Sequence, residues 1–292
     1  MLNPIFRLLA LLPLSWFHTT GILLGWAVYL ASPRYAARLR ENLAQSGLGG
    51  NDAAGIRKLL HQCIAESGKG VMELIPIWFG KPEKVAALVR DCRGWEHVEA
   101  GLARGKGVIF LTPHLGCFEI SALYAAQHFP MTVLYRPPKL AWLAALMIAG
   151  RARGQLTLAP ADLRGVRILL RALKRGQAIG LLPDQAPGVG EGVWADFFGR
   201  PAYTMTLPGR LAETGGATVL MAFARRLPQG QGYAITIQPV VESPPADASA
   251  AAQKLNLAVE DLVRGCPQQY LWSYNRYKAP AGAEKPGMKA EG

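Results

Sequence analysis

The segment Gly107-Val-Ile-Phe-Leu-Thr-Pro113 is followed at once by His114-Leu-Gly-Cys-Phe-Glu119. Its short run of β-branched and aromatic residues predicts a buried strand over Val108–Leu111. Pro113 ends that strand, and Gly116 permits a tight turn into a helix that begins near Cys117. The sequence therefore predicts an imidazole at the carboxyl end of a strand and a carboxylate in the first turn of the next helix.

The spacing of His114 and Glu119 restricts how the two side chains can meet. Five residues along one α-helix would place them about 140° apart, so they can meet only if His114 lies before the helix. A histidine held by a carboxylate is a general base, able to take a proton from an attacking hydroxyl. Taken alone, the pair also fits a helix-capping pair or a histidine whose hydrogen bonds are simply satisfied.

Apolar runs and helical patterns alternate along the middle of the chain. This alternation predicts an α/β fold with a mostly parallel central sheet flanked by helices. Two later strands are expected to form an antiparallel edge. The expected strands are Val108–Leu111, Met131–Tyr135, Leu156–Ala159, Ile179–Leu182, Thr218–Ala224 and Tyr233–Pro239. The expected helices between them lie near Glu119–Gln127, Ala141–Arg151 and Asp162–Lys174.

Length and composition favour a single domain that works at a membrane surface. The chain has 292 residues, of which 50% are hydrophobic, and a formal net charge of +12. Such a surplus of positive charge favours anionic lipids, phosphorylated substrates or an acidic carrier protein as partners. The sequence has no zinc-finger spacing and no RNA-binding aromatic block, so nucleic acid is not an expected partner. Its four scattered cysteines indicate neither a metal site nor a disulfide framework.

Residues Leu8–Leu30 form a long apolar stretch. It is long enough to cross a hydrocarbon core of about 30 Å, although Pro13, His18 and the following threonines interrupt it. Both a spanning helix and a helix lying in the membrane interface are therefore open. The arginines that follow favour the cytoplasmic side. We expect residues 1–31 to be a membrane anchor, 32–279 the catalytic domain, and 280–292 a disordered tail.

Further motifs follow the His-x4-Glu pattern in a fixed order. They are Tyr135-Arg136-Pro137, Leu182-Pro183-Asp184-Gln185, and Phe197-Phe198-Gly199-Arg200-Pro201-Ala202 with Thr204. This ordered set resembles the late acyltransferases of lipid A synthesis, which are lauroyl and myristoyl transferases within the glycerolipid acyltransferase superfamily. The resemblance extends from Asn42-Leu43 to Arg276-Tyr277-Lys278. It implies a glycerolipid-acyltransferase-like fold.

The resemblance implies that His114 and Glu119 are the catalytic pair. Glu119 would orient the His114 ring and stabilise the imidazolium, and it stands where the glycerol branch of the superfamily has aspartate. A mechanism that depends mainly on Glu119 is the alternative. Cys117 lies inside the motif, but we expect it to pack at the helix start rather than to act as a nucleophile.

Other residues in the matching motifs are implied to bind substrate. Arg136 follows a strand and would bind a phosphate or stabilise an oxyanion. Without the resemblance, an arginine at this position in a basic protein would be interpreted as an ordinary surface residue. Asp184 and Gln185 would hold acceptor hydroxyls or brace the catalytic pair, and a turn-capping aspartate fits equally well in isolation. The residues implied to shape the acyl or acceptor groove are Phe198, Gly199 and Thr204.

The implied activity is transfer of a fatty acyl group from acyl carrier protein to a hydroxyacyl chain of a lipid A precursor. It would take place on the cytoplasmic face of the inner membrane, with no cofactor or metal. The first alternative is an acyltransferase for glycerophospholipids or amino-acid-linked lipids, whose glycerol branch carries Glu-Gly-Thr-Arg where this chain has Asp184-Gln185. The second is a non-catalytic lipid-binding protein.

Overall fold

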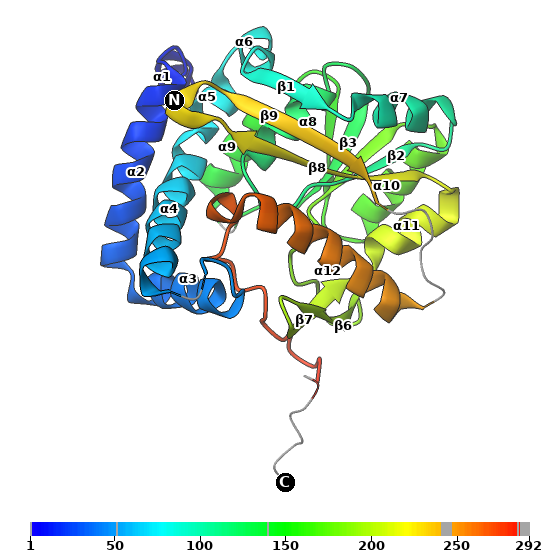
Figure 1. Ribbon diagram of the computed structural model, residues 1–292. Helices are drawn as coiled ribbons and strands as arrows, with labels where there is room; N and C mark the ends of the chain where they lie inside the picture. The colour runs from blue at the N-terminus through cyan, green and yellow to red at the C-terminus, as the bar shows by residue number, and fades with distance from the viewer. Residues whose placement is uncertain (1, 51, 139, 241–246, 285, 287–292) are drawn as a thin grey trace.

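The computed structural model describes residues 2–50, 52–138, 140–240, 247–284 and 286 of the chain. At its centre is a seven-stranded sheet with the strand order β1-β9-β8-β2-β5-β3-β4 (Figure 1). The strands are β1 (Val89–Arg93), β2 (Val108–Leu111), β3 (Met131–Tyr135), β4 (Leu156–Pro160), β5 (Ala178–Leu181), β8 (Thr218–Arg226) and β9 (Tyr233–Pro239).

The predicted α/β fold with a mostly parallel sheet is confirmed. Strands β8, β2, β5, β3 and β4 run parallel, while β9 pairs antiparallel with β8. The prediction that this antiparallel pair forms the edge is wrong, because β1 pairs in parallel with β9 and covers it. The sequence of β1, Val-Arg-Asp-Cys-Arg, is too charged to read as a strand, yet such charges suit an exposed edge.

Helices cover both faces of the sheet (Figure 1). Val108 and Phe110 of β2 pack on one face, and Ile109 and Leu111 pack on the other. Because both faces are buried, β2 reads as a continuous apolar run. The first face is covered by α6 (Pro82–Ala86), α7 (Trp95–Ala103), α8 (Phe118–Ala125) and α9 (Ala141–Arg151). The second is covered by α10 (Leu163–Lys174), α11 (Leu207–Gly215) and α12 (Ala248–Gly265).

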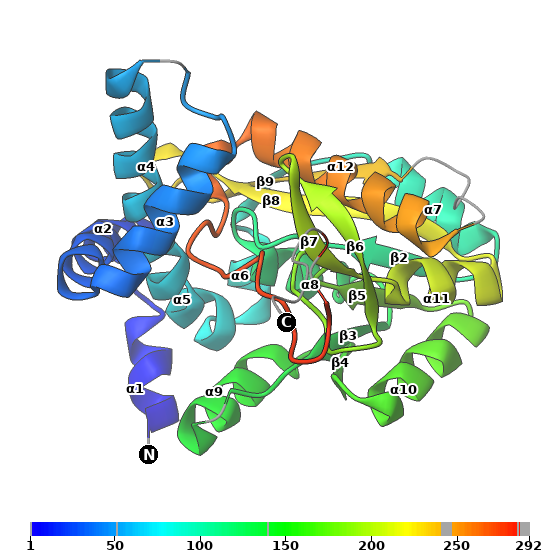
Figure 2. The same cartoon turned by 90° about the horizontal axis from the view of Figure 1, so that it is seen from below.

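The remaining helices gather at one end of the sheet, where Figures 1 and 2 show α2 beside α4. Gly21 and Gly25 of α2 meet Gly68 of α4 backbone to backbone, so these two helices approach closely. The helices of this group are α1 (Leu2–Leu9), α2 (Leu14–Ala31), α3 (Pro33–Gln45), α4 (Ala53–Met72) and α5 (Leu74–Phe79).

The expected single apolar helix over Leu8–Leu30 is not supported. The helical conformation is interrupted between α1 and α2. Pro13 is the N-cap residue of α2, where its missing amide hydrogen costs no hydrogen bond. In the described part of the chain no helix has the length and apolarity needed to cross a membrane. Residues 285 and 287–292 of the expected disordered tail lie outside the described residues.

A buried ion pair ties the N-terminal helices to the sheet. Glu73, which follows α4, accepts hydrogen bonds from the Arg226 guanidinium at 2.7–3.0 Å and from the Tyr233 hydroxyl at 3.0 Å. His18 of α2 lies 3.3 Å from the same carboxylate. Burial alone would raise the pKa of Glu73, but the Arg226 charge and the hydrogen bonds outweigh it and lower that pKa to about 2. Arg226 also donates to the backbone oxygen of Gly116 at 2.8 Å, beside His114.

We expect the stabilisation from Glu73 to depend on pH. Its folded-state pKa lies below the ordinary value of 4.5, so the stabilisation is present above pH 4.5 and is lost as the pH falls toward 2. The measurement is the free energy of unfolding of wild type and Glu73→Gln by urea titration across this window. The difference between the two proteins should shrink as the solution becomes more acidic. A difference that stays constant would show that the carboxyl has an ordinary pKa.

Candidate active site

The register of β2 and β5 brings two polar residues to the same level of the sheet. Leu111 pairs with Leu181 at the carboxyl ends of these parallel strands, and the amide of Thr112 still donates to the Leu181 carbonyl at 2.9 Å. His114 and Asp184 each stand three residues beyond that last pair. The two strands therefore deliver an imidazole and a carboxylate side by side, at the edge where ligands bind in open α/β sheets.

Asp184 holds both the backbone and the side chain of His114. The His114 amide donates to Asp184 Oδ2 at 2.9 Å, and the ring Nδ1 lies 2.8 Å from Oδ1. Burial acts to raise the pKa of Asp184, but the His114 charge and these hydrogen bonds hold it below its ordinary value. Because an ionised carboxylate only accepts, Nδ1 is the protonated nitrogen whenever the imidazole is neutral, and Nε2 then has the lone pair of a general base.

Other polar groups lie around the Nε2 side and the face of the imidazole. Gln185 Nε2 lies 3.3 Å from it, and the Tyr274 ring stacks over the imidazole at 6.3 Å between centroids. Arg136, which is exposed at the carboxyl end of β3, is close enough for its charge to lower the Tyr274 pKa, although burial raises that pKa overall. The structure therefore brings two sequence-predicted site residues, Asp184 and Gln185, to the two nitrogens of the His114 ring, and it places Arg136 at the same edge of the sheet.

The loop that carries His114 is fixed along its whole length by backbone contacts. Gly116 has a φ of +60°, and a Cβ at this position would strike the carbonyl of Ala224 in β8. The Gly116 amide donates to the Gln269 carbonyl at 3.0 Å, and the Leu271 amide donates to the His114 carbonyl at 3.0 Å. Together with the bond from Arg226, these contacts pre-organise the imidazole.

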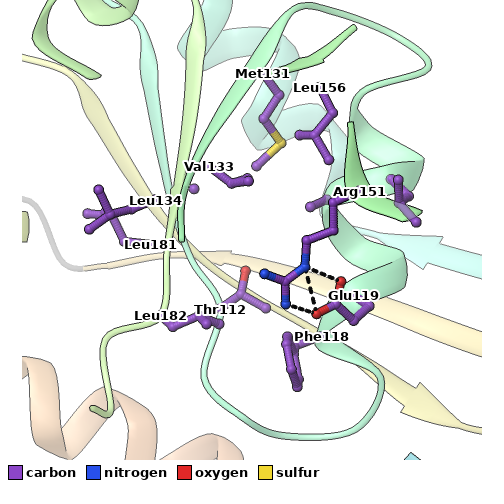
Figure 3. Close-up of a pocket in the computed structure, with 13 residues that line it drawn as sticks. Thr112, Phe118, Glu119, Met131, Val133, Leu134, Arg151, Leu156, Leu181 and Leu182 are labelled. Atoms are coloured by element: carbon purple, nitrogen blue, oxygen red, sulfur yellow. Dashed lines mark hydrogen bonds and ion pairs between the residues drawn. The ribbon is translucent and has the colours of Figure 1, made fainter. Parts of the chain in front are cut away.

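Glu119 does not play the orienting role expected of it, because Asp184 takes that place. The Glu119 carboxylate forms an ion pair with Arg151 at the end of α9 and accepts from Trp78 Nε1 at 3.0 Å (Figure 3). The Arg151 Nε donates to both carboxylate oxygens at 2.9 and 3.1 Å. Lying in the first turn of α8, the Glu119 side chain faces α5 and α9, where a guanidinium balances its buried charge.

An apolar pocket begins at this ion pair (Figure 3). Its cavity has a volume of about 50 Å³ and lies between the sheet and helices α8 and α9. Thr112 and Leu182, each two residues before the polar pair, stand in its wall. The other lining residues include Phe118, Met131, Val133, Leu134 and Leu156. Phe118 also lies against the His114 ring, at 4.8 Å between centroids, so the pocket adjoins the candidate base.

The third group of predicted residues lies in a hairpin of β6 (Gly192–Phe197) and β7 (Arg200–Met205). Phe198 and Gly199 form its two-residue turn with φ values of 47° and 70°, which are typical of a type I′ turn. The Phe198 amide donates to Glu260 at 2.7 Å. Thr204 is fully buried, and its hydroxyl accepts from Arg276 at 2.7 Å. These contacts fix the hairpin in place, and the groove-shaping role of its residues stays a prediction.

Three side chains of the site were not identified from sequence: Trp78, Arg151 and Tyr274. Each comes from an element distant in the chain, and a single tryptophan, arginine or tyrosine carries no spacing signal.

A larger cavity of about 760 Å³ lies between α11 and α12, near the start of β8. In the described residues no cluster of three or more His, Cys, Asp or Glu side chains could hold a metal ion.

Comparison with known proteins places the chain among bacterial acyltransferases. It is 30% identical to a lipid A biosynthesis lauroyltransferase of Escherichia coli over 76% of this chain and 72% of that protein. It is 26% identical to a lipid A biosynthesis palmitoleoyltransferase of the same organism, covering 86% and 83%. A phosphatidylinositol mannoside acyltransferase of Mycobacterium tuberculosis is 25% identical, covering 79% of each.

The strongest of these findings is the match to a family model. Residues 2–279 match the model described as bacterial lipid A biosynthesis acyltransferase, which covers every element of the fold. The order of motifs and the named relatives agree with it. The chain belongs to the bacterial lipid A biosynthesis acyltransferase family and is an acyltransferase.

Proposed function

We propose that this enzyme moves a fatty acyl group from acyl carrier protein to a hydroxyl on an acyl chain of a lipid A precursor. The observation that carries the proposal is the His114–Asp184 pair, which leaves a free imidazole nitrogen next to an apolar pocket. Its chemistry matches what hydroxyl acylation needs, a base for the hydroxyl and an apolar pocket for the acyl chain. Family membership supports the acceptor and the pathway.

His114 acts as the general base in this mechanism. The acceptor hydroxyl takes the place of the Gln185 amide at Nε2 and gives its proton to that nitrogen as the oxygen attacks the thioester carbonyl. Asp184 stabilises the imidazolium that forms and keeps Nδ1 protonated. When the tetrahedral intermediate collapses, the C–S bond breaks and His114 returns the proton to the departing thiolate. The products are the ester and the free thiol of the donor.

Glu119 serves the reaction through Arg151 and the acyl pocket. Its carboxylate holds the Arg151 guanidinium in the wall of the pocket. The ion pair is therefore a polar group at one end of an otherwise apolar pocket. The present cavity of about 50 Å³ is far smaller than the roughly 300–1,000 Å³ of typical ligand pockets, so α8 and α9 would have to part to admit a full acyl chain. The extent to which they part would then select the chain length.

Arg136 is placed to bind an anionic group of the acceptor. Its exposed guanidinium lies at the same edge as His114 and can hold a phosphate through two parallel hydrogen bonds. The phosphorylated disaccharide of a lipid A precursor presents such a group. A glycolipid acceptor of the phosphatidylinositol mannoside type also carries phosphate, and competition between the two acceptors in one assay would separate them.

The N-terminal helices form a surface that suits a membrane interface on the cytoplasmic side. Trp16, Leu23 and Leu30 recur every seven residues along α2 and are 62%, 68% and 75% exposed. Helix α2 contains no lysine, arginine, aspartate or glutamate. Exposed apolar faces of this kind mark contacts with lipid or protein, and the exposed arginines of α3 suit anionic lipids. The helix therefore lies in the interface rather than across the bilayer.

The mechanism makes different predictions for the two carboxylates. His114→Ala and Asp184→Asn should each lower kcat by at least about a hundredfold, because both remove the active form of the base. Glu119→Gln should instead lower kcat/KM, chiefly by raising the KM for long-chain donors, and should shift the chain-length preference. The measurement is transfer from a series of acyl carrier proteins that carry different acyl chains.

A matched control is Asp52→Asn, which changes an exposed aspartate that caps helix α4 and should leave turnover near wild type. Near-normal kcat in a folded Asp184→Asn enzyme, together with a collapse of kcat in Glu119→Gln at every chain length, would assign the catalytic carboxylate to Glu119 instead.

The membrane surface leads to a second prediction. Replacing Trp16, Leu23 and Leu30 together by Gln should weaken binding to anionic vesicles by at least about tenfold, because each side chain loses favourable burial. The melting temperature should stay near wild type, since these side chains are exposed. Residual binding should fall with salt. Gln at the exposed Val189 and Leu257 is the control. Unchanged vesicle binding in the triple variant would overturn this surface assignment.

A further inference from the structure

Helix α10 presents an exposed face made almost entirely of cations. At 3.6 residues per turn its five basic residues fall within an arc of about 100°. We call this face the α10 ridge, and it consists of Arg164, Arg167, Arg171, Lys174 and Arg175, all exposed. The only acidic residue between 161 and 177 is Asp162, whose side chain caps the helix.

The opposite face of α10 is buried in the hydrophobic core. Leu169 and Leu173 are buried against the sheet, so the helix has no apolar face left to insert into lipid. Arg164 lies 4.0 Å from Asp162, and Arg175 donates to Gln177 at 3.1 Å. Across the residues that the structure describes, no carboxylate pairs with Arg167, Arg171 or Lys174 within 4.0 Å. Such a face carries an uncompensated positive field.

The ridge begins at the same edge of the sheet as the candidate active site. Helix α10 follows the carboxyl end of β4, and Pro160 there pairs with Tyr135, the residue before Arg136. Leu163, which is 78% exposed, stands at the start of the ridge. Figure 2 shows α10 at the far side of the molecule from α2, whose apolar face would contact the membrane. The ridge therefore lies on a part of the molecule distant from that surface.

We infer that the α10 ridge is the docking surface for the acidic carrier protein that delivers the acyl group. This inference rests on the proposed function and adds where the donor binds. An acidic helix laid along α10 would pair with a row of cations, and Leu163 would supply an apolar contact at the end nearest the active site. A carrier protein docked there can reach His114 with its acylated arm while the acceptor enters from the membrane.

The test reverses the charge of the ridge with Arg167→Glu, Arg171→Glu and Lys174→Glu in one protein. A milder variant carries Gln at the same positions. The control, Arg57→Glu, Lys58→Glu and Lys84→Glu, makes the same change in net charge at exposed positions elsewhere. Binding of holo acyl carrier protein, turnover with acylated carrier protein, turnover with an acyl N-acetylcysteamine thioester, and binding to anionic vesicles are measured for each protein.

The ridge variant should bind carrier protein at least about tenfold more weakly and raise its KM to match, with a smaller effect from Gln. Its kcat with the small thioester and its vesicle binding should match the control. The inference is overturned if wild type and variant bind carrier protein alike, if wild type does not bind it, or if vesicle binding falls instead. Failure of wild type to transfer the acyl group from a bound carrier protein would contradict the proposed donor, whereas normal transfer by the ridge variant with an unchanged KM would overturn the ridge assignment alone.

Discussion

The register of two adjacent parallel strands is the constraint on which the site depends. Because Leu111 pairs with Leu181, the chain leaves β2 and β5 at the same level, and three residues later it places His114 against Asp184. A shift of one residue in this pairing would turn the side chains of one strand to the opposite face. The core packing on both faces of β2 and β5 thus also determines the geometry of the base.

A second set of contacts fixes the loop that carries His114 against strand β8. Gly116 can approach Ala224 only without a side chain, and Arg226 ties the Gly116 carbonyl to the buried carboxylate of Glu73. Glu73 also contacts His18 of α2. The helix proposed to contact the membrane and the loop that carries the base therefore share one buried ion network. Loss of either charge in that network would leave its partner buried and unpaired, which is costly.

Sequence patterns were sufficient to predict the elements but not every partner. The apolar runs that became β2, β3, β4, β5, β8 and β9 were visible, as was the helix over Ala141–Arg151. The His-x4-Glu spacing favoured Glu119 as the partner of His114, since nearby residues are the natural candidates. The partner is Asp184, 70 residues later, because strand pairing and not chain proximity decides the contact. Likewise, hydropathy showed that Leu8–Leu30 is apolar but could not show that Gly21 and Gly25 pack against α4.

The most direct test of the central claim is the proton NMR spectrum of the His114 ring. A strong hydrogen bond from Nδ1–H to a carboxylate should give a downfield imidazole resonance that ¹⁵N labelling of histidine assigns to Nδ1. The account predicts that this resonance is present in wild type and in Glu119→Gln and is absent in Asp184→Asn. A resonance that survives in Asp184→Asn but disappears in Glu119→Gln would show that Glu119 holds the ring, and would contradict the account.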